Sequence, residues 1–345
     1  MNSDFQIREH VDLSPYNTMG LAAKARYFIS LKSVDQLKEF IADKIWQENQ
    51  RWILGGGSNV LFIDDFDGLV VHVDIPGKEV VQESDDLVLL KAGAGENWHE
   101  LVMFCVDKGW GGIENLSLIP GSVGAAPIQN IGAYGTELVD VFHVLEAVNV
   151  ETGEIHTFTK NECKFGYRDS IFKQEARGKY VVVSVTLRLQ KDPQINTVYK
   201  ALSEALESKG ISTPTIKDVS DTVIEIRRSK LPDPAEIGNT GSFFKNPVIS
   251  ESIFDELKER FPDIPHYSVE SGAKIPAAWL IDQCGWKGKR FGDAGVHKMQ
   301  ALVIVNYGEA TGSEIWSLAQ RIQASVEDKF GISLVPEVNV VGKTA

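Results

Sequence analysis

Residues 119–135 read IPGSVGAAPIQNIGAYG, an unbroken run of Gly, Pro and mostly small residues. The run has neither the helical period of about 3.6 residues nor the alternation of a strand, so it predicts an ordered functional loop. Such small side chains would let the main chain lie flat against a planar ring, with its amides free to bond ring nitrogen and oxygen atoms. A structural Ω-loop is the alternative interpretation.

A second glycine-rich stretch, GGGSN at residues 55–59, lies between two short apolar runs. Consecutive glycines can form a nest of N–H groups that binds a phosphate without a Lys, although a plain tight turn is equally consistent with the pattern. Val60 occupies the third Gly position of a G-x-G-x-x-G fingerprint, and a Walker A pattern is absent from the sequence, so neither a Rossmann nor a P-loop site is supported. Two such loops in one chain favour binding.

The composition narrows the possible partners. The 345 residues include 35 Lys and Arg against 48 Asp and Glu, a formal net charge of −13. This balance argues against general binding of nucleic acid or of an anionic membrane, while a local basic pocket for a small anion stays possible. Cys105, Cys163 and Cys284 are odd in number and far apart, so we expect no disulfide framework and no metal site. Without a signal-like N-terminus or a membrane-length apolar run, a soluble cytoplasmic protein is expected.

The remaining pattern indicates an α+β protein, because helices and strands alternate without the regularity of a Rossmann sheet. We expect Ser33 to cap the first helix, and the last helix to bury the stripe Ile315, Leu318, Ile322 and Val326. The predicted helices cover residues 33–47, 96–108, 197–209, 218–230, 250–260, 274–285 and 311–329. The predicted strands cover residues 52–54, 60–63, 69–73, 143–150, 180–190, 301–306 and 333–340. In the strand at 180–190, alternation places Val181, Val183, Val185 and Leu187 on one face.

Together the two loops resemble the FAD-binding domain of the vanillyl-alcohol-oxidase type of flavoproteins. The stretch from Gly121 to Gly135 is more particular and is similar to the UDP-N-acetylenolpyruvoylglucosamine reductase family. The resemblance implies that the pyrophosphate of a non-covalent FAD is held by Gly55, Gly56, Gly57, Ser58 and Asn59. It also implies that the flavin and its ribityl chain lie along Gly121, Ser122, Gly124, Ala125, Ala126, Gln129, Asn130, Gly132, Ala133, Tyr134 and Gly135.

Three further segments match the same family: GYRDS at 166–170, GSFFKNP at 241–247 and PEV at 336–338. The resemblance places the family's catalytic residues on Arg168, Ser242 and Glu337. A guanidinium can bind a carboxylate with two hydrogen bonds and stabilise the charge that develops when an enolpyruvyl ether accepts a hydride. Ser242 would then donate a proton to the carbanionic carbon, directly or through water, while Glu337 orients the intermediate.

The family's substrate contacts fall on Tyr199, Lys230 and Asn246, and the segment around Tyr199 is similar to the longer subgroup that carries a Tyr loop over the substrate. Lys230 and Asn246 are the expected diphosphate or carboxylate partners. Arg227 and Arg228, which precede Lys230, are interpreted as a solvated helix end that suits the helix dipole. The basic run at 287–290 is interpreted as solvated too.

The resemblance implies a domain plan and a reaction. We expect two FAD-binding lobes at residues 1–75 and 76–228, a substrate-binding α+β domain at 229–330, and a C-terminal strand at 331–345 that returns to the active site. NADPH would reduce FAD, and the flavin would reduce UDP-N-acetylenolpyruvoylglucosamine to UDP-N-acetylmuramate, a peptidoglycan precursor. A monomer is expected.

Three other readings stay open at this point. The first is an oxidase of the same fold that uses O₂, which the GSFFKNP match opposes. The second is a flavin- or nucleotide-sugar-binding module without catalysis, which the presence of Arg168, Ser242 and Glu337 opposes. The third is an α+β scaffold that binds no cofactor, and a colourless protein that FAD does not reconstitute would support it.

Overall fold

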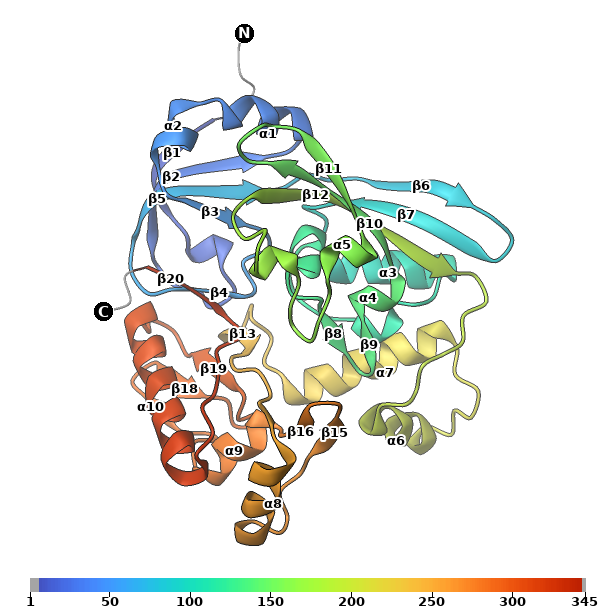
Figure 1. Cartoon of the computed structure of the whole chain (residues 1–345), viewed down its shortest axis with the longest axis vertical. Helices are drawn as coiled ribbons and strands as arrows, with labels where there is room; N and C mark the ends of the chain where they lie inside the picture. Colours follow the sequence, from blue (N-terminus) through green and yellow to red (C-terminus); the bar gives the residue numbers. More distant parts are fainter. Residues whose placement is uncertain (1–5, 343–345) are drawn as a thin grey trace. The chain divides into compact units, whose positions relative to one another are not determined.

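The computed structural model describes residues 6–342 (Figure 1). The chain forms two compact units, and each unit is made of stretches that are not contiguous in the sequence. Unit 1 holds the chain up to Val11 together with Ala25–Gly56 and Asp67–Ser229. Unit 2 holds Asp12–Lys24, Gly57–Phe66 and the chain from Lys230 onward. The outer edges of the predicted domain plan, at residues 1 and 345, lie outside the described residues, and its internal edges stay predictions.

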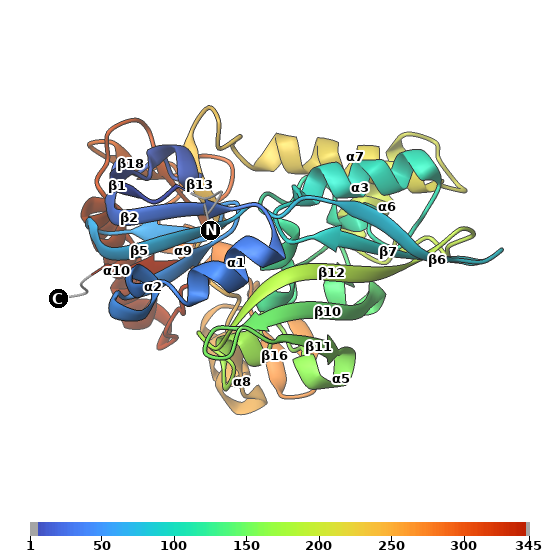
Figure 2. The ribbon, with the colours of Figure 1, turned by 90° about the horizontal axis from the view of Figure 1, so that it is seen from above.

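Unit 1 is built on two sheets (Figure 2). The first has the order β1-β2-β5-β3, with β1 at Arg8–Asp12, β2 at Lys24–Leu31, β5 at Phe66–Val73 and β3 at Arg51–Leu54. The second has the order β11-β10-β12-β7-β6, with β11 at Ile155–Thr159, β10 at Phe142–Asn149, β12 at Tyr180–Gln190, β7 at Leu87–Gly93 and β6 at Lys78–Glu83. The helices are α1 at Val34–Ile41, α2 at Lys44–Glu48, α3 at Trp98–Lys108, α4 at Leu138–Val141, α5 at Lys160–Cys163, α6 at Lys200–Ser208 and α7 at Ile216–Lys230.

Two hydrophobic clusters hold these layers together. One joins α1 and α2 to both sheets and contains Leu37, Phe40 and Ile41 of α1. The other joins α3 to the five-stranded sheet and extends into the glycine-rich segment through Val123 and Ala126. The segment that the sequence predicts as a functional loop is therefore anchored in a core.

Unit 2 consists of three small sheets and three helices within the described residues. The first sheet has the order β13-β19-β18-β17, with β13 at Gly238–Ser242, β19 at Val303–Asn306, β18 at Ala294–Val296 and β17 at Arg290–Phe291. The second has the order β14-β16-β15, with β14 at Val248–Ile249, β16 at Gly272–Lys274 and β15 at Tyr267–Val269. The third pairs β20 at Asn339–Val341 with β4 at Val60–Phe62. The helices of unit 2 are α8 at Glu251–Arg260, α9 at Ala277–Gln283 and α10 at Gly312–Phe330. As predicted, α10 buries Ile315, Leu318, Ile322 and Val326.

Several helices are shorter than predicted because a capping residue or a proline decides where they begin. The segment 33–47 forms two helices rather than one, since the Asp43 carboxylate accepts from Ile45 N and starts α2 afresh. Helix α9 begins after Pro276. Ser33 and Thr311 cap α1 and α10 as their sequences indicate, Thr311 in a capping box with Glu314.

Two strand predictions were wrong in detail. Val181 and Val183 pack in the cluster of α1, whereas Val185 and Leu187 pack in the cluster of α3, so the four do not share a face. The pairing with β10 slips between Ala147–Val182 and Glu146–Ser184, and this bulge reverses the alternation. The strand predicted at 333–340 forms only at Asn339–Val341, where it pairs in parallel with β4.

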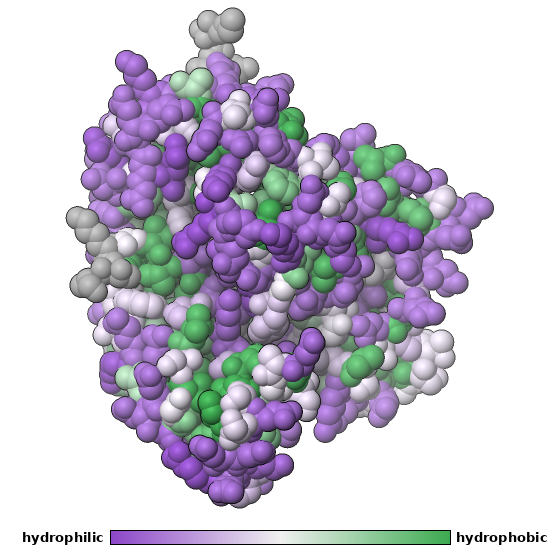
Figure 3. Space-filling view, in the orientation of Figure 1, coloured by the Kyte–Doolittle hydropathy of each residue, from purple (hydrophilic) through white to green (hydrophobic). Residues whose placement is uncertain are grey.

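The face of the molecule drawn in Figure 3 is mainly hydrophilic, and its hydrophobic residues form separate groups. None of the helices between residues 6 and 342 is both long enough and apolar enough to cross a bilayer.

Helix α10 starts in close contact with β4, and this contact supplies a test of the packing of unit 2. A Cβ at Gly312 would overlap the carbonyl group of Phe62, whereas a Cβ at Gly308 would meet only the end of the Asp293 side chain. We expect Gly312→Ala to lower the free energy of unfolding by about 2–4 kcal/mol. The cost of the overlap should exceed the ~1 kcal/mol of helix stability that Ala provides relative to Gly. Urea unfolding should show Gly308→Ala close to wild type, and equal midpoints for the two variants would contradict the packing.

Candidate functional site

The two glycine-rich segments predicted to bind a cofactor come together in unit 1. Gly56 N donates to the Ser122 hydroxyl at 3.2 Å, and a Cβ on Gly56 would lie 2.8 Å from the Gly121 Cα. A Cβ on Gly55 would overlap the Ser122 side chain. Because the two main chains touch, only glycine fits at these positions. The contact leaves a surface of main-chain amides and small side chains, which suits the phosphates and flat ring of a dinucleotide.

The other residues of the first loop belong to unit 2. Gly57 has a φ of +63°, and a Cβ there would overlap the Tyr16 carbonyl, so this position also requires glycine. The Asn59 side chain donates to the carbonyl of Glu337 at 3.2 Å, and the Asn339 side chain donates back to the Asn59 carbonyl at 2.9 Å. Unit 2 therefore brings a predicted phosphate-binding residue beside a predicted catalytic one, although they are far apart in the sequence.

The second segment has more structure than its sequence predicts. It contains a 3₁₀ helix at Val123–Ile128 and a hairpin in which β8 at Gly132–Ala133 pairs with β9 at Thr136–Glu137. These elements are too short to produce a period in the sequence. The buried Asn130 side chain donates to Glu137 at 2.8 Å and to the Gly166 carbonyl at 3.1 Å, and accepts from Val139 N. Asn130 thus ties the segment to the turn that carries Arg168.

The first residues of α3 hold the entry to this segment. Trp98 N donates to the Gly121 carbonyl, and Leu118 N donates to His99 Nδ1 at 3.0 Å. Leu118 has a φ of +59°, a left-handed conformation that a branched residue seldom adopts. A histidine that accepts at Nδ1 must be neutral and carry its proton on Nε2. Burial, followed by the charges of Arg228 and Arg227, lowers the pKa of His99.

Arg168 lies in a tight turn of unit 1. Gly166 and Asp169 bond to each other through their main chains, and Arg168 between them has a φ of +52°. This conformation is strained for a residue with a Cβ, and such strain is concentrated at functional sites. Arg168 Nη2 donates to the Gly132 carbonyl at 2.7 Å. The guanidinium predicted to bind a carboxylate therefore lies against the segment predicted to line the flavin.

Ser242 and Glu337 are neighbours in unit 2. Ser242 ends β13 and is exposed, and Glu337 N donates to the carbonyl of the next residue, Phe243, at 2.9 Å. A bridge between Phe244 and Pro336 continues this antiparallel pairing. Two of the three predicted catalytic residues thus lie on adjacent segments of one unit, while Arg168 belongs to the other unit.

The residues predicted to bind substrate lie in different settings. Tyr199, at the start of α6, packs its ring edge-on against Tyr134, with 5.2 Å between ring centroids. Lys230 is the exposed last residue of α7. The Asn246 side chain accepts from Ala277 N at 2.9 Å, which places it at the start of α9. Their contacts with a ligand stay predictions.

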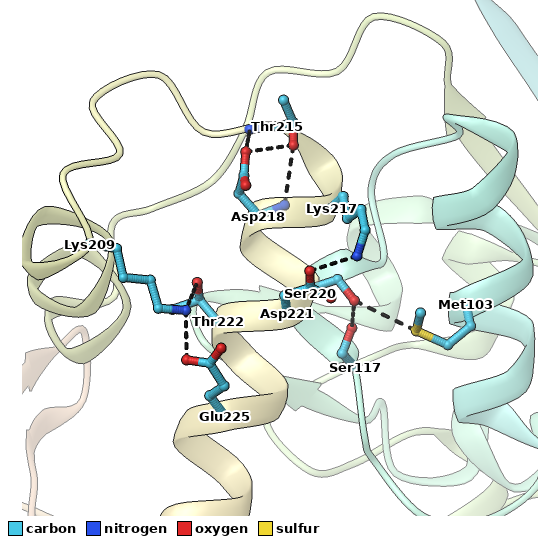
Figure 4. Close-up of polar contacts among 10 residues, drawn as sticks. All are labelled: Met103, Ser117, Lys209, Thr215, Lys217, Asp218, Ser220, Asp221, Thr222 and Glu225. Carbon is cyan, nitrogen blue, oxygen red and sulfur yellow. Dashed lines mark hydrogen bonds and ion pairs between the residues drawn. The ribbon is translucent and has the colours of Figure 1, made fainter.

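Helix α7 is fastened to unit 1 by polar contacts along its length (Figure 4). A capping pair of Thr215 and Asp218 starts it, the Ser220 hydroxyl lies 2.8 Å from that of Ser117, and Lys209 bonds Thr222 and Glu225. Arg227 follows Ser220 by seven residues, so two turns of helix place it on the same face. That face is turned toward the segment that holds Ser117.

The interpretation of Arg227 as a solvated helix end was wrong, whereas Arg228 is exposed as expected. Arg227 forms a side-chain hydrogen bond with Tyr134, its Nε is buried without a hydrogen-bond partner within residues 6–342, and burial lowers its pKa. The spacing Val219, Val223, Arg227 carried the signal, since both valines are fully buried. A half-buried cation of this kind suits an anionic ligand.

Comparison with known proteins agrees with this arrangement. A family described as FAD binding domain matches residues 25–159, and one described as UDP-N-acetylenolpyruvoylglucosamine reductase, C-terminal domain, matches residues 233–341. The UDP-N-acetylenolpyruvoylglucosamine reductase of Flavobacterium johnsoniae is 51% identical over 338 residues, 97% of this chain and 100% of that protein. The protein of the same name from Amoebophilus asiaticus is 52% identical over 336 residues, 97% of this chain and 99% of its own.

A solved structure supports the fold. The reductase of Thermus caldophilus matches with a TM-score of 0.70 and 23% identity, covering 98% of this chain and 100% of that one. The fold and the FAD-binding match together define a flavin-dependent oxidoreductase. More particularly, the chain belongs to the UDP-N-acetylenolpyruvoylglucosamine reductase family. The predicted α+β fold, with an FAD-binding part and a C-terminal domain, is confirmed, and so is the resemblance to this family.

The bond between His99 and Leu118 predicts a dependence on pH. Above about pH 6.5 the histidine is neutral in both the folded and unfolded chain. As the pH falls below that value the unfolded chain binds a proton that the folded chain resists, so stability falls until the lowered pKa of His99 is reached. In His99→Asn the amide oxygen can still accept from Leu118 N without titrating. Urea unfolding at about pH 7.5 and 5.5 should therefore show a smaller loss of stability for His99→Asn than for wild type.

The matched control is His143→Asn, because His143 is exposed on β10 and its replacement should leave the wild-type pH dependence unchanged. An equal loss of stability in wild type and His99→Asn would show that the His99 bond does not set this dependence.

Proposed function

We propose that the protein uses NADPH and FAD to reduce UDP-N-acetylenolpyruvoylglucosamine to UDP-N-acetylmuramate, in the synthesis of peptidoglycan precursors. The observation that carries the proposal is the antiparallel pairing of the segments that hold Ser242 and Glu337, in a chain that is 51–52% identical to reductases of that name. A monomer in the cytoplasm is part of the proposal.

The residues present fit FAD. In unit 1, Gly55 and Gly56 touch the segment from Gly121 to Gly135, and a Cβ would fill the space at both glycines. The Gly56 amide already donates to the Ser122 hydroxyl, so the neighbouring main-chain amides of the two loops would hold the pyrophosphate. The small residues of the second segment would lie along the flavin. When bound, FAD supplies the hydride chemistry, with NADPH as the reductant.

Arg168 is proposed to bind the carboxylate of the enolpyruvyl group. Its bond from Nη2 to the Gly132 carbonyl fixes the plane of the guanidinium. A positioned, permanently charged fork stabilises negative charge as it develops on the carboxylate, without reorganising during the reaction. Glu337 would help to orient the same group.

Ser242 is proposed to give a proton to the carbon beside the new C–H bond. Its hydroxyl lies at the exposed end of β13, where Gly241 with a φ of +70° turns the chain. A hydroxyl is a weak acid, but the acceptor carbon is strongly basic, and a nearby cation would lower the barrier. The proton could also pass through a water held by Ser242.

The sugar nucleotide would bring two phosphates to a protein of net charge −13, so it requires a local positive site. Arg227, half-buried beside Tyr134, and Lys230, one turn further along α7, are the cations suited to this role. Tyr199 beside Tyr134 and the Asn246 amide would complete the contacts.

The decisive assay is anaerobic NADPH oxidation by the purified protein, with and without UDP-N-acetylenolpyruvoylglucosamine. We expect sustained oxidation only when the sugar nucleotide is present, because the reduced cofactor then has an acceptor. If the protein oxidises only one equivalent of NADPH and the sugar nucleotide does not extend this oxidation, the protein is a flavoprotein but the proposed substrate is wrong. Turnover driven by O₂ without NADPH would indicate an oxidase.

Replacing Ser242 tests the proton donor. We expect Ser242→Ala to lower kcat by about 10²–10⁴-fold, the usual contribution of a positioned acid, while bound FAD and its reduction by NADPH are retained. The matched control is Ser268→Ala, which removes an exposed hydroxyl from β15 of the same unit. Unchanged turnover in Ser242→Ala would remove this residue from the mechanism.

A further inference from the structure

The segment between β12 and α6 carries Tyr199, yet it contributes few buried groups of its own. Val198 is 89% exposed and Tyr199 is 42% exposed. Side chains of two asparagines bond to the hairpin of β8 and β9. Asn196 lies within the segment, and Asn115 lies in the 3₁₀ turn at Glu114–Leu116. We call this pair the asparagine latch.

The latch forms hydrogen bonds to the carbonyls of the two residues at the tip of the hairpin. Asn196 Nδ2 donates to the Gly135 carbonyl at 2.9 Å and lies 3.4 Å from Thr136 Oγ1. Asn115 Nδ2 donates to the Tyr134 carbonyl and to the Asn196 carbonyl, both at 2.9 Å. Both protons of the buried Asn115 amide are thus used, and they join the hairpin tip to the segment.

The shape of the hairpin tip makes these carbonyls available. Tyr134 and Gly135 have φ values of +50° and +82°, the left-handed pair of a two-residue turn of type I′. The turn leaves the carbonyls of both residues outside the short ladder, where the asparagines reach them. Tyr134 is strained in this conformation, and the latch together with the Arg227 bond to its side chain compensates for the strain.

The latch also fixes the approach to Tyr199. Asn196 Oδ1 accepts from Val198 N at 3.1 Å, which turns the chain immediately before Tyr199. The Tyr199 ring then meets the Tyr134 ring at an interplanar angle of 73°, and Tyr134 packs in the small core formed by Leu202, Leu206, Val219 and Val223. A single side chain thus sets both the anchor of the segment and the direction in which Tyr199 leaves it.

We propose that Asn196, supported by Asn115, is a positioning residue for the sugar nucleotide, and that it acts by holding Tyr199 against Tyr134 before the ligand arrives. The inference rests on the proposed function, in which Tyr199 contacts the substrate. A segment ordered in advance loses less conformational freedom on binding, so the latch contributes to affinity without touching the ligand. It should therefore affect KM rather than the chemical step.

The variants isolate this effect. Asn196→Ala removes the whole side chain, and Asn196→Asp keeps the acceptor for Val198 N but replaces the donor to Gly135. Loss of one or two hydrogen bonds should raise KM for UDP-N-acetylenolpyruvoylglucosamine about fivefold to thirtyfold in both variants, with kcat within about twofold of wild type. The FAD spectrum should be unchanged. The control is Asn161→Ala, an exposed asparagine on α5, with KM as in wild type.

A double-mutant cycle separates positioning from general destabilisation. If Asn196 acts through Tyr199, adding Asn196→Ala to Tyr199→Ala should raise KM no further than Tyr199→Ala alone. An additive rise in KM would overturn the inference, because the two residues would then act independently. An Asn196→Ala enzyme with wild-type KM would overturn it as well.

Hydrogen exchange of the ligand-free protein keeps this test distinct from that of the proposed function. The amides of residues 198–203 should exchange faster in Asn196→Ala than in wild type, whatever the substrate is. Equal exchange rates would reject the latch. The wild-type protein could also fail to turn over the sugar nucleotide while Asn196→Ala still exchanges faster. This result would confirm the latch as a structural device but would reject the proposed function, and with it the inference that the latch serves this substrate.

Discussion

The contact between the main chains of Gly56 and Gly121 is the constraint on which the candidate site depends. A side chain at either Gly55 or Gly56 would separate two segments that must touch to present their amides together. The Ser122 hydroxyl receives the Gly56 amide and so closes the contact. The remainder of unit 1 supports it: α3 bonds Gly121 through Trp98, and the core of α3 extends beneath Val123 and Ala126. A rigid scaffold is required because a loop can hold a cofactor in one position only if its own position is fixed.

A second set of contacts extends from this loop to α7. Ser117 bonds Ser220, and two turns later Arg227 bonds the Tyr134 side chain, so the helix is fixed to the segment at both points. Placing a guanidinium in a half-buried position without an ion-pair partner costs free energy, and a bound anion would offset that cost. Between residues 6 and 342 Arg227 is not part of any ion pair within 4 Å. This free-energy cost is difficult to explain in a purely structural helix, and it is consistent with a site that binds a phosphate or a carboxylate.

Much of this could be predicted from the sequence, and the reasons for the failures are physical. The glycine-rich loops were predicted from their composition, and Arg168, Ser242 and Glu337 from motifs that resemble the reductase family. The structure brings the two loops into contact and pairs the segments that carry Ser242 and Glu337, while the roles of these residues stay predictions. The prediction for Arg227 was wrong because its neighbours Arg228 and Lys230 are exposed, and the three cations look alike in the sequence. Only the helical spacing from the buried Val223 distinguishes Arg227 from the other two. Asn115 and Asn196 carry no motif at all. Their role depends on the carbonyls of a two-residue turn, and a turn with Tyr in its first left-handed position is difficult to anticipate. The bulge in β12 was missed because a single extra residue leaves the composition of a strand unchanged.

The order of the chain explains why the site draws on such distant segments. The first glycine-rich loop contains the point where the chain passes from unit 1 into unit 2, between Gly56 and Gly57. Just beyond that point β4 pairs with β20, and this parallel pairing needs a long connection, which the whole remainder of the chain provides. The pairing brings Glu337 beside Asn59, and the same C-terminal segment bonds Phe243 next to Ser242. One short parallel pair therefore joins the loop predicted to bind phosphate to two catalytic candidates. Because the C-terminal segment must be in place before these residues meet, the site of unit 2 can form only after the last strand has been added.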